Sequence, residues 1–243
     1  MKRNLMLAVA ISAVVLTNVK FAANASPQQD FSQIDPVWAA GVIDQSLRSG
    51  PLGSAWIAMK EVFPGGYHQL MLDIANFAIH HQDSTVKTRD FVRDHVTSQI
   101  QNAQRAPAVA QAEYQREKAD FLMLISNSNV EACAKFSNGE LNLNIATNLN
   151  DYEMKHFSQL IAAEVRAIGA GLKSPTTYDP LTPADVSVLK SILASRGFSE
   201  ADQKGFLAGT VGETPAEICH AGVVRNSVFA AAPAEIVAKV AFR

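Results

Sequence analysis

The chain has 243 residues, of which 48% are hydrophobic and 18% are charged. This hydrophobic content excludes an intrinsically disordered chain, and 13 Gly with 10 Pro exclude a collagen-like or linker-like sequence. Because only 7% of the residues are aromatic, we expect a core built mainly from Ala, Val, Leu and Ile. None of these values identifies a reaction.

The N-terminal residues have the features of a signal peptide. Lys2 and Arg3 supply positive charge, residues 5–17 are uncharged and apolar, and Ala-Asn-Ala at 23–25 is the small-x-small pattern that precedes cleavage. We therefore expect residues 1–25 to be removed, with the cut between Ala25 and Ser26. The alternative is an uncleaved membrane anchor, which the short apolar stretch disfavours because a spanning helix needs about 20 apolar residues.

Removal of residues 1–25 would change the net charge of the protein, and the signal peptide itself indicates export. The removal takes away three of the 21 basic residues and none of the 23 acidic ones, so the mature chain has a net charge of −5. An acidic surface of this kind gives no attraction to phosphate backbones, so nucleic acid is not expected as a partner. We expect residues 26–243 to form a single α-helical domain in the periplasm or outside the cell, with no transmembrane segment.

The mature chain contains two cysteines, Cys133 and Cys219. In an oxidising compartment such a pair is expected to form one disulfide. The alternative is a pair of buried free thiols. A bond between them would join the middle of the chain to its C-terminal helix.

Helix-start sequences recur along the chain and predict an all-α fold. Each places a capping residue before Pro or before an acidic residue of the first turn. The five are Asp35-Pro36, Ser128-Asn129-Val130-Glu131, Asn150-Asp151, Thr182-Pro183-Ala184-Asp185 and Thr214-Pro215-Ala216-Glu217. Between them, apolar residues recur every three or four positions, which predicts a multi-helix bundle of antiparallel and crossing helices.

Glycine and proline predict where several helices end. The long apolar repeat that begins at Val96 predicts one long helix or a pair of helices, bent or broken at Pro107, since proline lacks the N–H that the helix needs. Gly169 and Gly171 are expected to end the preceding helix, and Gly197 to cap the one after it. The segment 141–145 alternates apolar and polar residues, and we expect it to be an extended connection or the start of the next helix. The nearly all-apolar stretch 221–232 should form a helix in the middle of the bundle.

One helix carries a polar face that contains a candidate catalytic pair. Asp73, Asn76 and His80 are spaced by three and four, so they share one face of the helix that opens at Pro64. A carboxylate and an imidazole on one face can perform acid–base chemistry or bind a metal. The alternative interpretation is an ordinary solvated face. Since metal sites usually recruit three or four ligands, we expect neither a metal nor another cofactor here.

Aromatic residues flank a Pro-Gly-Gly turn near Trp56 and Tyr67. Such a turn can line a ligand-binding cleft, which makes these two side chains the candidate ligand-binding residues. The alternative is a tight helix–helix corner packed by large side chains.

Sequence signatures of zinc proteases, nucleotide-binding loops, serine hydrolases and calcium loops are missing from the chain. The sequence therefore favours an exported, non-catalytic helical protein of binding, adaptor or envelope-interaction type. Its partner would be an envelope or extracellular protein or a small ligand. The alternatives are an exported hydrolase-like enzyme that uses His80 and Asp73, and a small-ligand or metal carrier with a cleft near Trp56 and Tyr67.

Overall fold

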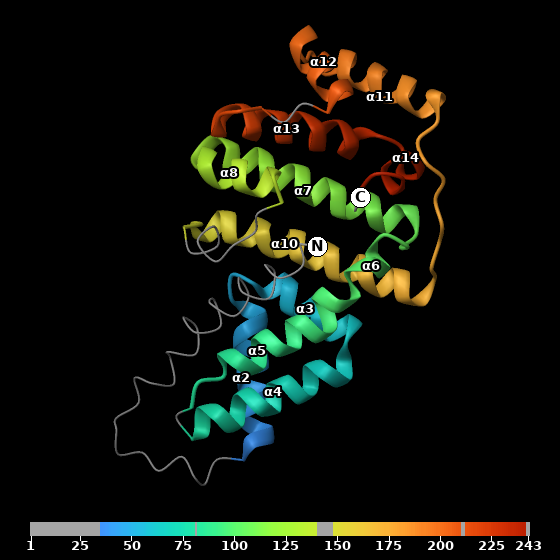
Figure 1. Ribbon diagram of the computed structural model, residues 1–243. Coiled ribbons are helices and arrows are strands. Elements are labelled where there is room, and N and C mark those ends of the chain that lie inside the picture. The colour runs from blue at the N-terminus through green and yellow to red at the C-terminus, as the bar shows by residue number, and fades with distance from the viewer. Residues whose placement is uncertain (1–34, 81, 140–147, 210–211, 242–243) are drawn as a thin grey trace. The chain divides into compact units, whose positions relative to one another are not determined.

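The computed structural model describes residues 35–80, 82–139, 148–209 and 212–241, and all regular structure in these residues is helical (Figure 1). The all-α prediction and the disulfide are therefore confirmed. The expected signal peptide and the alternating segment 141–145 lie outside the described residues. None of the helices in the described ranges is long and apolar enough to cross a membrane.

The chain divides into two compact units. Unit 1 contains residues up to 100 together with 141–165, and unit 2 contains 101–140 together with 166–243. The prediction of a single domain for residues 26–243 remains a prediction. The helix α10 (Asp151–Lys173) contributes its first part to unit 1 and its last part to unit 2.

Unit 1 is built from short helices around a buried aromatic core. The helices are α2 (Pro36–Ser49), α3 (Gly53–Val62), α4 (Pro64–Ile79) and α5 (Thr85–Phe91), followed by a π-helical turn (Val92–Val96) and a 3₁₀ turn (Thr97–Gln99). The predicted start of α2 is confirmed, since the Asp35 carboxylate accepts a hydrogen bond from the N–H of Val37 at 2.9 Å. The Oγ of Ser158 on α10 accepts from the N–H of Ala55 at 3.1 Å, which ties α10 to α3.

Unit 2 is a bundle in which α13 (Pro215–Ala231) packs on several neighbours. These neighbours are α7 (Ala108–Ser128), α8 (Val130–Ser137), α11 (Pro183–Ser195), α12 (Glu200–Ala208) and α14 (Ala234–Ala238) (Figure 1). The short helix α6 (Ile100–Ala103) precedes α7, and the break at Pro107 is confirmed. The central position predicted for the apolar stretch 221–232 is also confirmed, because Val224 and Val228 lie in the core.

Side-chain caps begin most of the predicted helices. Thr182 with Asp185 and Thr214 with Glu217 form capping boxes, in which each side chain bonds the backbone N–H of the other. The start of α8 differs from the prediction by one residue, because Asn129 caps it rather than Ser128. An Asn side chain at this position accepts the N–H of Ala132 at 2.9 Å, so the cap is satisfied one position later.

The glycine stop predicted within α10 is wrong. The helix continues through Gly169 and Gly171 to Lys173. A Cβ at Gly171 would lie 1.8 Å from the backbone oxygen of Asn102, so this glycine permits a close approach of two chain segments. The stop predicted at Gly197 is confirmed: α11 ends at Ser195, and Gly197 has φ +71°.

Candidate functional site

The structure places the predicted polar face on α4, but Asp73 and His80 have separate partners. The Asp73 carboxylate accepts from Gln69 at 2.9 Å and lies 3.9 Å from the ammonium of Lys87. The Nδ1 of His80 is 2.7 Å from the backbone oxygen of Asn76, at the end of the helix. Within the described ranges, no three His, Cys, Asp or Glu side chains are grouped as a metal site would require.

Trp56 and Tyr67 lie in the core of unit 1, where each is 2% exposed. Their rings meet edge to face with centroids 6.2 Å apart, and the Tyr67 hydroxyl donates to the Asp44 carboxylate at 2.8 Å. The arrangement matches the packed helix–helix corner that the sequence offered as the alternative to a cleft. A ligand at this corner would have to displace core side chains.

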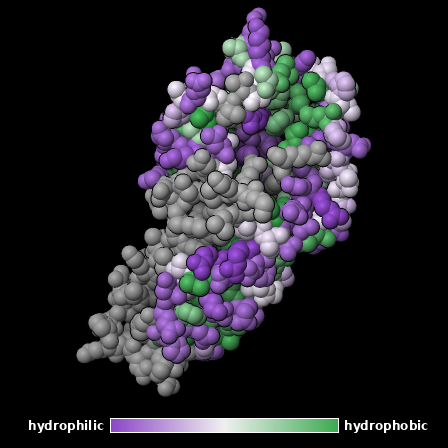
Figure 2. Space-filling view, in the orientation of Figure 1, coloured by the Kyte–Doolittle hydropathy of each residue, from purple (hydrophilic) through white to green (hydrophobic). Residues whose placement is uncertain are grey.

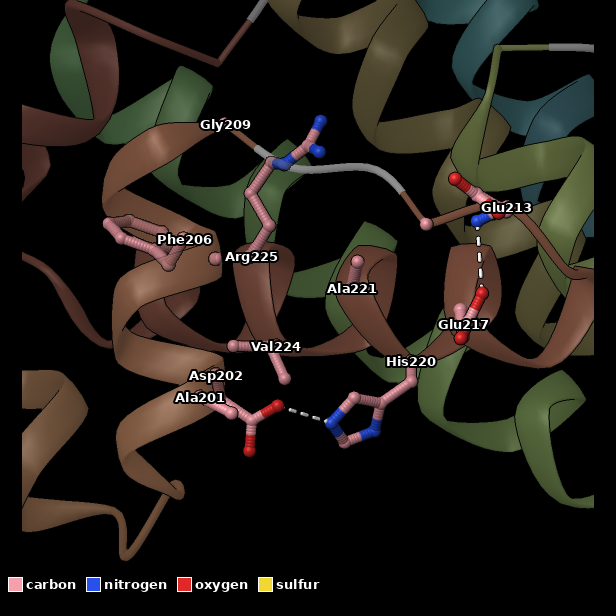
Figure 3. Close-up of a pocket in the computed structure, with 12 residues that line it drawn as sticks. Ala201, Asp202, Phe206, Gly209, Glu213, Glu217, His220, Ala221, Val224 and Arg225 are labelled. Atoms are coloured by element: carbon pink, nitrogen blue, oxygen red, sulfur yellow. Dashed lines mark hydrogen bonds and ion pairs between the residues drawn. The ribbon is translucent and has the colours of Figure 1, made fainter.

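A pocket of about 400 Å³ opens in unit 2 between α12 and α13, and Gly209, Gly212 and Glu213 also line it (Figure 3). Apolar atoms contribute most of its surface, and the side chains of Phe206 and Val224 form part of that surface. The twelve lining residues are Ala201, Asp202, Gly205, Phe206, Gly209, Gly212, Glu213, Glu217, His220, Ala221, Val224 and Arg225. Figure 2 shows hydrophobic and hydrophilic side chains next to one another on the surface of unit 2.

Local sequence signals fix the two helices that form the pocket. Ser199 and Asp202 form a capping box at the start of α12, and Thr214 and Glu217 form one at the start of α13. The ring of Phe206 packs edge to face on Phe229, with centroids 5.6 Å apart, which anchors α12 on α13. The positions of Asp202 and Glu217 in the pocket therefore follow from helix capping.

Two of the acidic side chains in the pocket are already matched by donors. The Oδ1 of Asp202 lies 2.7 Å from the Nε2 of His220, while its Oδ2 accepts from the Ser199 hydroxyl at 2.7 Å. These two hydrogen bonds, that of Ser199 first, hold the pKa of Asp202 below its usual value. The backbone N–H groups of Thr214 and Glu213 likewise lower the pKa of Glu217.

Two charged side chains in the pocket remain unmatched. Within the described part of the chain, neither the Arg225 guanidinium nor the Glu213 carboxylate forms a hydrogen bond or an ion pair. Arg225 is half-buried and extends from α13, whereas Glu213 is exposed in the segment before it (Figure 3). A partly buried guanidinium without a partner is suited to bind an anion, preferably through two parallel hydrogen bonds.

Sequence reasoning did not find this pocket. The capping sequence Ser199-Glu200-Ala201-Asp202 has the same form as those used to predict other helices, and it would have identified α12. The contact between Asp202 and His220 joins residues 18 positions apart through the packing of two helices. No sequence spacing predicts that contact.

Comparisons with protein-family models, with curated protein sequences and with solved structures find no match to this chain. The function of the pocket therefore has to follow from its own chemistry.

Proposed function

We propose that the chain is an exported, non-catalytic binding protein and that the pocket between α12 and α13 holds its small-molecule ligand. The observation that supports this proposal is the combination of an apolar wall with the unmatched charges of Arg225 and Glu213. Ligand sites in proteins have this composition, with mostly apolar lining and a few polar groups that fix the orientation of the ligand.

The size of the pocket favours a small ligand over a protein partner. Its volume of about 400 Å³ lies near the lower end of the range for ligand pockets, which is about 300–1,000 Å³. The pocket is concave and bounded by two helices, whereas protein interfaces are broader surfaces. A binding role also agrees with the matched state of Asp202 and Glu217, which are committed to helix caps.

The export part of the proposal depends on the N-terminal sequence and on the disulfide. Disulfides persist in oxidising compartments, so the bond between Cys133 and Cys219 is compatible with export. Intact mass spectrometry of the protein recovered from the envelope or medium tests this part. A mass that corresponds to a chain beginning at or near Ser26 supports export with cleavage. A mass that corresponds to a chain still containing residues 1–25 contradicts it.

A matched pair of variants on α12 tests the ligand site. Ala201 lines the pocket, whereas Ala208 is exposed on the same helix and does not line it. We expect Ala201→Phe to fill the pocket and to abolish binding of small-molecule fragments, detected by amide chemical shifts in a fragment screen. Ala208→Phe should leave binding unchanged. The proposal is wrong if no fragment shifts the pocket residues, or if both variants bind as the unaltered protein does.

A further inference from the structure

The residues that α13 contributes to the pocket form one continuous face. These residues are Glu217, His220, Ala221, Val224 and Arg225. They follow one another at alternating intervals of three residues and one residue, which places them on the same side of successive helix turns. Glu217 and Arg225 are eight positions apart, which corresponds to about 12 Å along the helix axis. The pocket therefore extends along α13 and has two separated ends.

Side chains of opposite charge without hydrogen-bond partners lie at the two ends of this face: Arg225 on α13 itself, and Glu213 just before the helix begins. At one end, the backbone N–H of Glu213 is held by the Glu217 carboxylate at 3.0 Å, which fixes Glu213 next to the start of α13. Gly212 has φ +92° and packs against Glu217, where a Cβ would lie 2.6 Å from the Cβ of Glu217. This close approach needs glycine. At the other end, Arg225 lies beyond Ala221 along the helix (Figure 3).

The middle of the pocket between these ends is largely apolar, and its carboxylate, that of Asp202, already has hydrogen-bond partners. Ala221 and Val224 of α13 line the pocket together with Phe206 of α12, and Gly205 adds no side chain. The Asp202 carboxylate accepts from the Ser199 hydroxyl at 2.7 Å and lies 2.7 Å from the Nε2 of His220, so both of its oxygens have hydrogen-bond partners. The Glu217 carboxylate accepts from the backbone N–H groups at the start of α13, so within the described residues Glu213 is the lining carboxylate that has no hydrogen-bond partner.

We propose that the pocket binds an elongated dipolar ligand, in which an apolar body carries an ammonium group for Glu213 and a carboxylate for Arg225. A short apolar peptide with free termini has this chemistry. Three extended residues span about 10 Å, which is close to the rise of about 12 Å along the helix axis from Glu217 to Arg225. This inference rests on the proposed function, since it names the ligand class of the same pocket.

Trialanine and its two blocked forms test the proposal. Amide chemical-shift titration of the mature protein gives a dissociation constant for trialanine, for N-acetyl-trialanine and for trialanine amide. We expect each blocked form to bind about fivefold more weakly, because each loses one ion pair of partly exposed groups. Equal binding of all three peptides would overturn the proposal.

Two charge-removing variants assign each terminus to its partner. Arg225→Gln should weaken the binding of trialanine about fivefold and leave the binding of trialanine amide unchanged, since trialanine amide has no carboxylate to pair with Arg225. Glu213→Gln should weaken trialanine by a similar factor and leave the N-acetyl peptide unchanged. Arg196→Gln and Glu235→Gln are the controls, because both residues are exposed and neither lines the pocket. If the controls weaken binding as much as the pocket variants, the assignment is wrong.

The outcomes also separate this inference from the proposed function. If Ala201→Phe abolishes binding of other fragments but neither trialanine nor 8-aminooctanoate binds, the ligand class is wrong and the pocket remains a ligand site. If trialanine binds and Ala201→Phe abolishes that binding, both proposals are supported. If 8-aminooctanoate, which has the same two charges, binds while trialanine does not, the peptide assignment is wrong and the dipolar chemistry is retained.

Discussion

Asp44 is a carboxylate of unit 1 that connects three helices. It accepts hydrogen bonds from Lys60 at 2.9 Å, Tyr67 at 2.8 Å and Arg48 at 3.1 Å, and it therefore joins α2, α3 and α4. Burial raises the pKa of this carboxyl, but the three hydrogen bonds more than offset that effect, so its pKa lies below the usual value. The ionised form is thus the one that holds the three helices together.

Replacing Asp44 with Asn should destabilise unit 1. The substitution keeps the size of the side chain but removes the charge that Lys60 and Arg48 bind, so we expect the free energy of unfolding to fall by about 1.5–3 kcal/mol. Urea denaturation followed by circular dichroism measures the change. Asp73→Asn is the control, since that carboxylate is more exposed, and its effect should stay within about 0.5 kcal/mol. Equal effects of the two variants would contradict the role given to Asp44.

Asp185 should make the stability of unit 2 sensitive to acid. Its Oδ2 accepts from Lys239 of the C-terminal segment at 2.7 Å and from the backbone N–H of Thr182 at 2.7 Å. These hydrogen bonds, that of Lys239 first, lower the pKa of Asp185 to about 2. Because the folded pKa is depressed, the stabilisation is complete above the usual value near 4 and is lost as the pH falls towards 2.

The prediction for Asp185 concerns the slope of stability against pH. Asp185→Asn should flatten the decline in melting temperature between pH 4 and about 2, because the substituted side chain no longer takes up a proton there. Lys239→Gln should flatten it only in part, since the hydrogen bonds from Thr182 remain. Thermal melts at several pH values provide the measurement. An unchanged slope in Asp185→Asn would show that other groups control the acid response.

At the scale of elements, the caps and the apolar spacing made the helices predictable because they act locally. Thr182, Thr214 and Asn150 each begin a helix where the sequence indicates, since the cap and its partner are three residues apart. The prediction that α10 ends at Gly171 was wrong because the reason for this glycine is not local. Its neighbour is the backbone of Asn102, which is distant in the sequence, so the reason for the glycine is visible only in the folded chain.

A pair of glycine-to-alanine variants tests this explanation. Gly171→Ala should destabilise the protein by about 1–3 kcal/mol, because the added Cβ would lie 1.8 Å from the Asn102 oxygen. Gly41→Ala lies within α2 and has nothing within 4 Å of its added Cβ, so it should stabilise the protein by about 0.5–1 kcal/mol. Chemical denaturation distinguishes the two. A stabilising Gly171→Ala would mean that the two segments do not approach this closely.

The candidate site was less predictable than the helices because it is assembled from two of them. The sequence directed attention to Asp73, His80, Trp56 and Tyr67, which the structure places on a solvated helix face and in a packed core. The pocket instead combines α12 with one face of α13. In the sequence, the polar residues of the pocket look like ordinary surface residues. Only the fold, in which Phe206 packs on Phe229, shows that the two helices place them around one pocket.

For the whole molecule, the division into two units determines where the disulfide acts. Cys133 on α8 and Cys219 on α13 both belong to unit 2, and both are buried. Unit 1 has its own core, formed by side chains such as Trp56, Tyr67 and Ile74. Loss of the disulfide should therefore weaken the two units unequally.

Reduction of the disulfide should loosen unit 2 and leave much of unit 1 unchanged. The bond closes a loop across 86 positions, and loop entropy sets an upper limit of about 4–5 kcal/mol on its contribution to stability. Because a domain of this kind has a total stability of only about 5–15 kcal/mol, the melting temperature should fall substantially.

Hydrogen-exchange mass spectrometry of the reduced and oxidised protein should show faster exchange in α8, α12 and α13 of the reduced protein. The control is Cys133→Ala with Cys219→Ala, which should behave as the reduced protein does. Equal acceleration in α2, α3 and α4 would mean that the two units unfold together, with α10 coupling them.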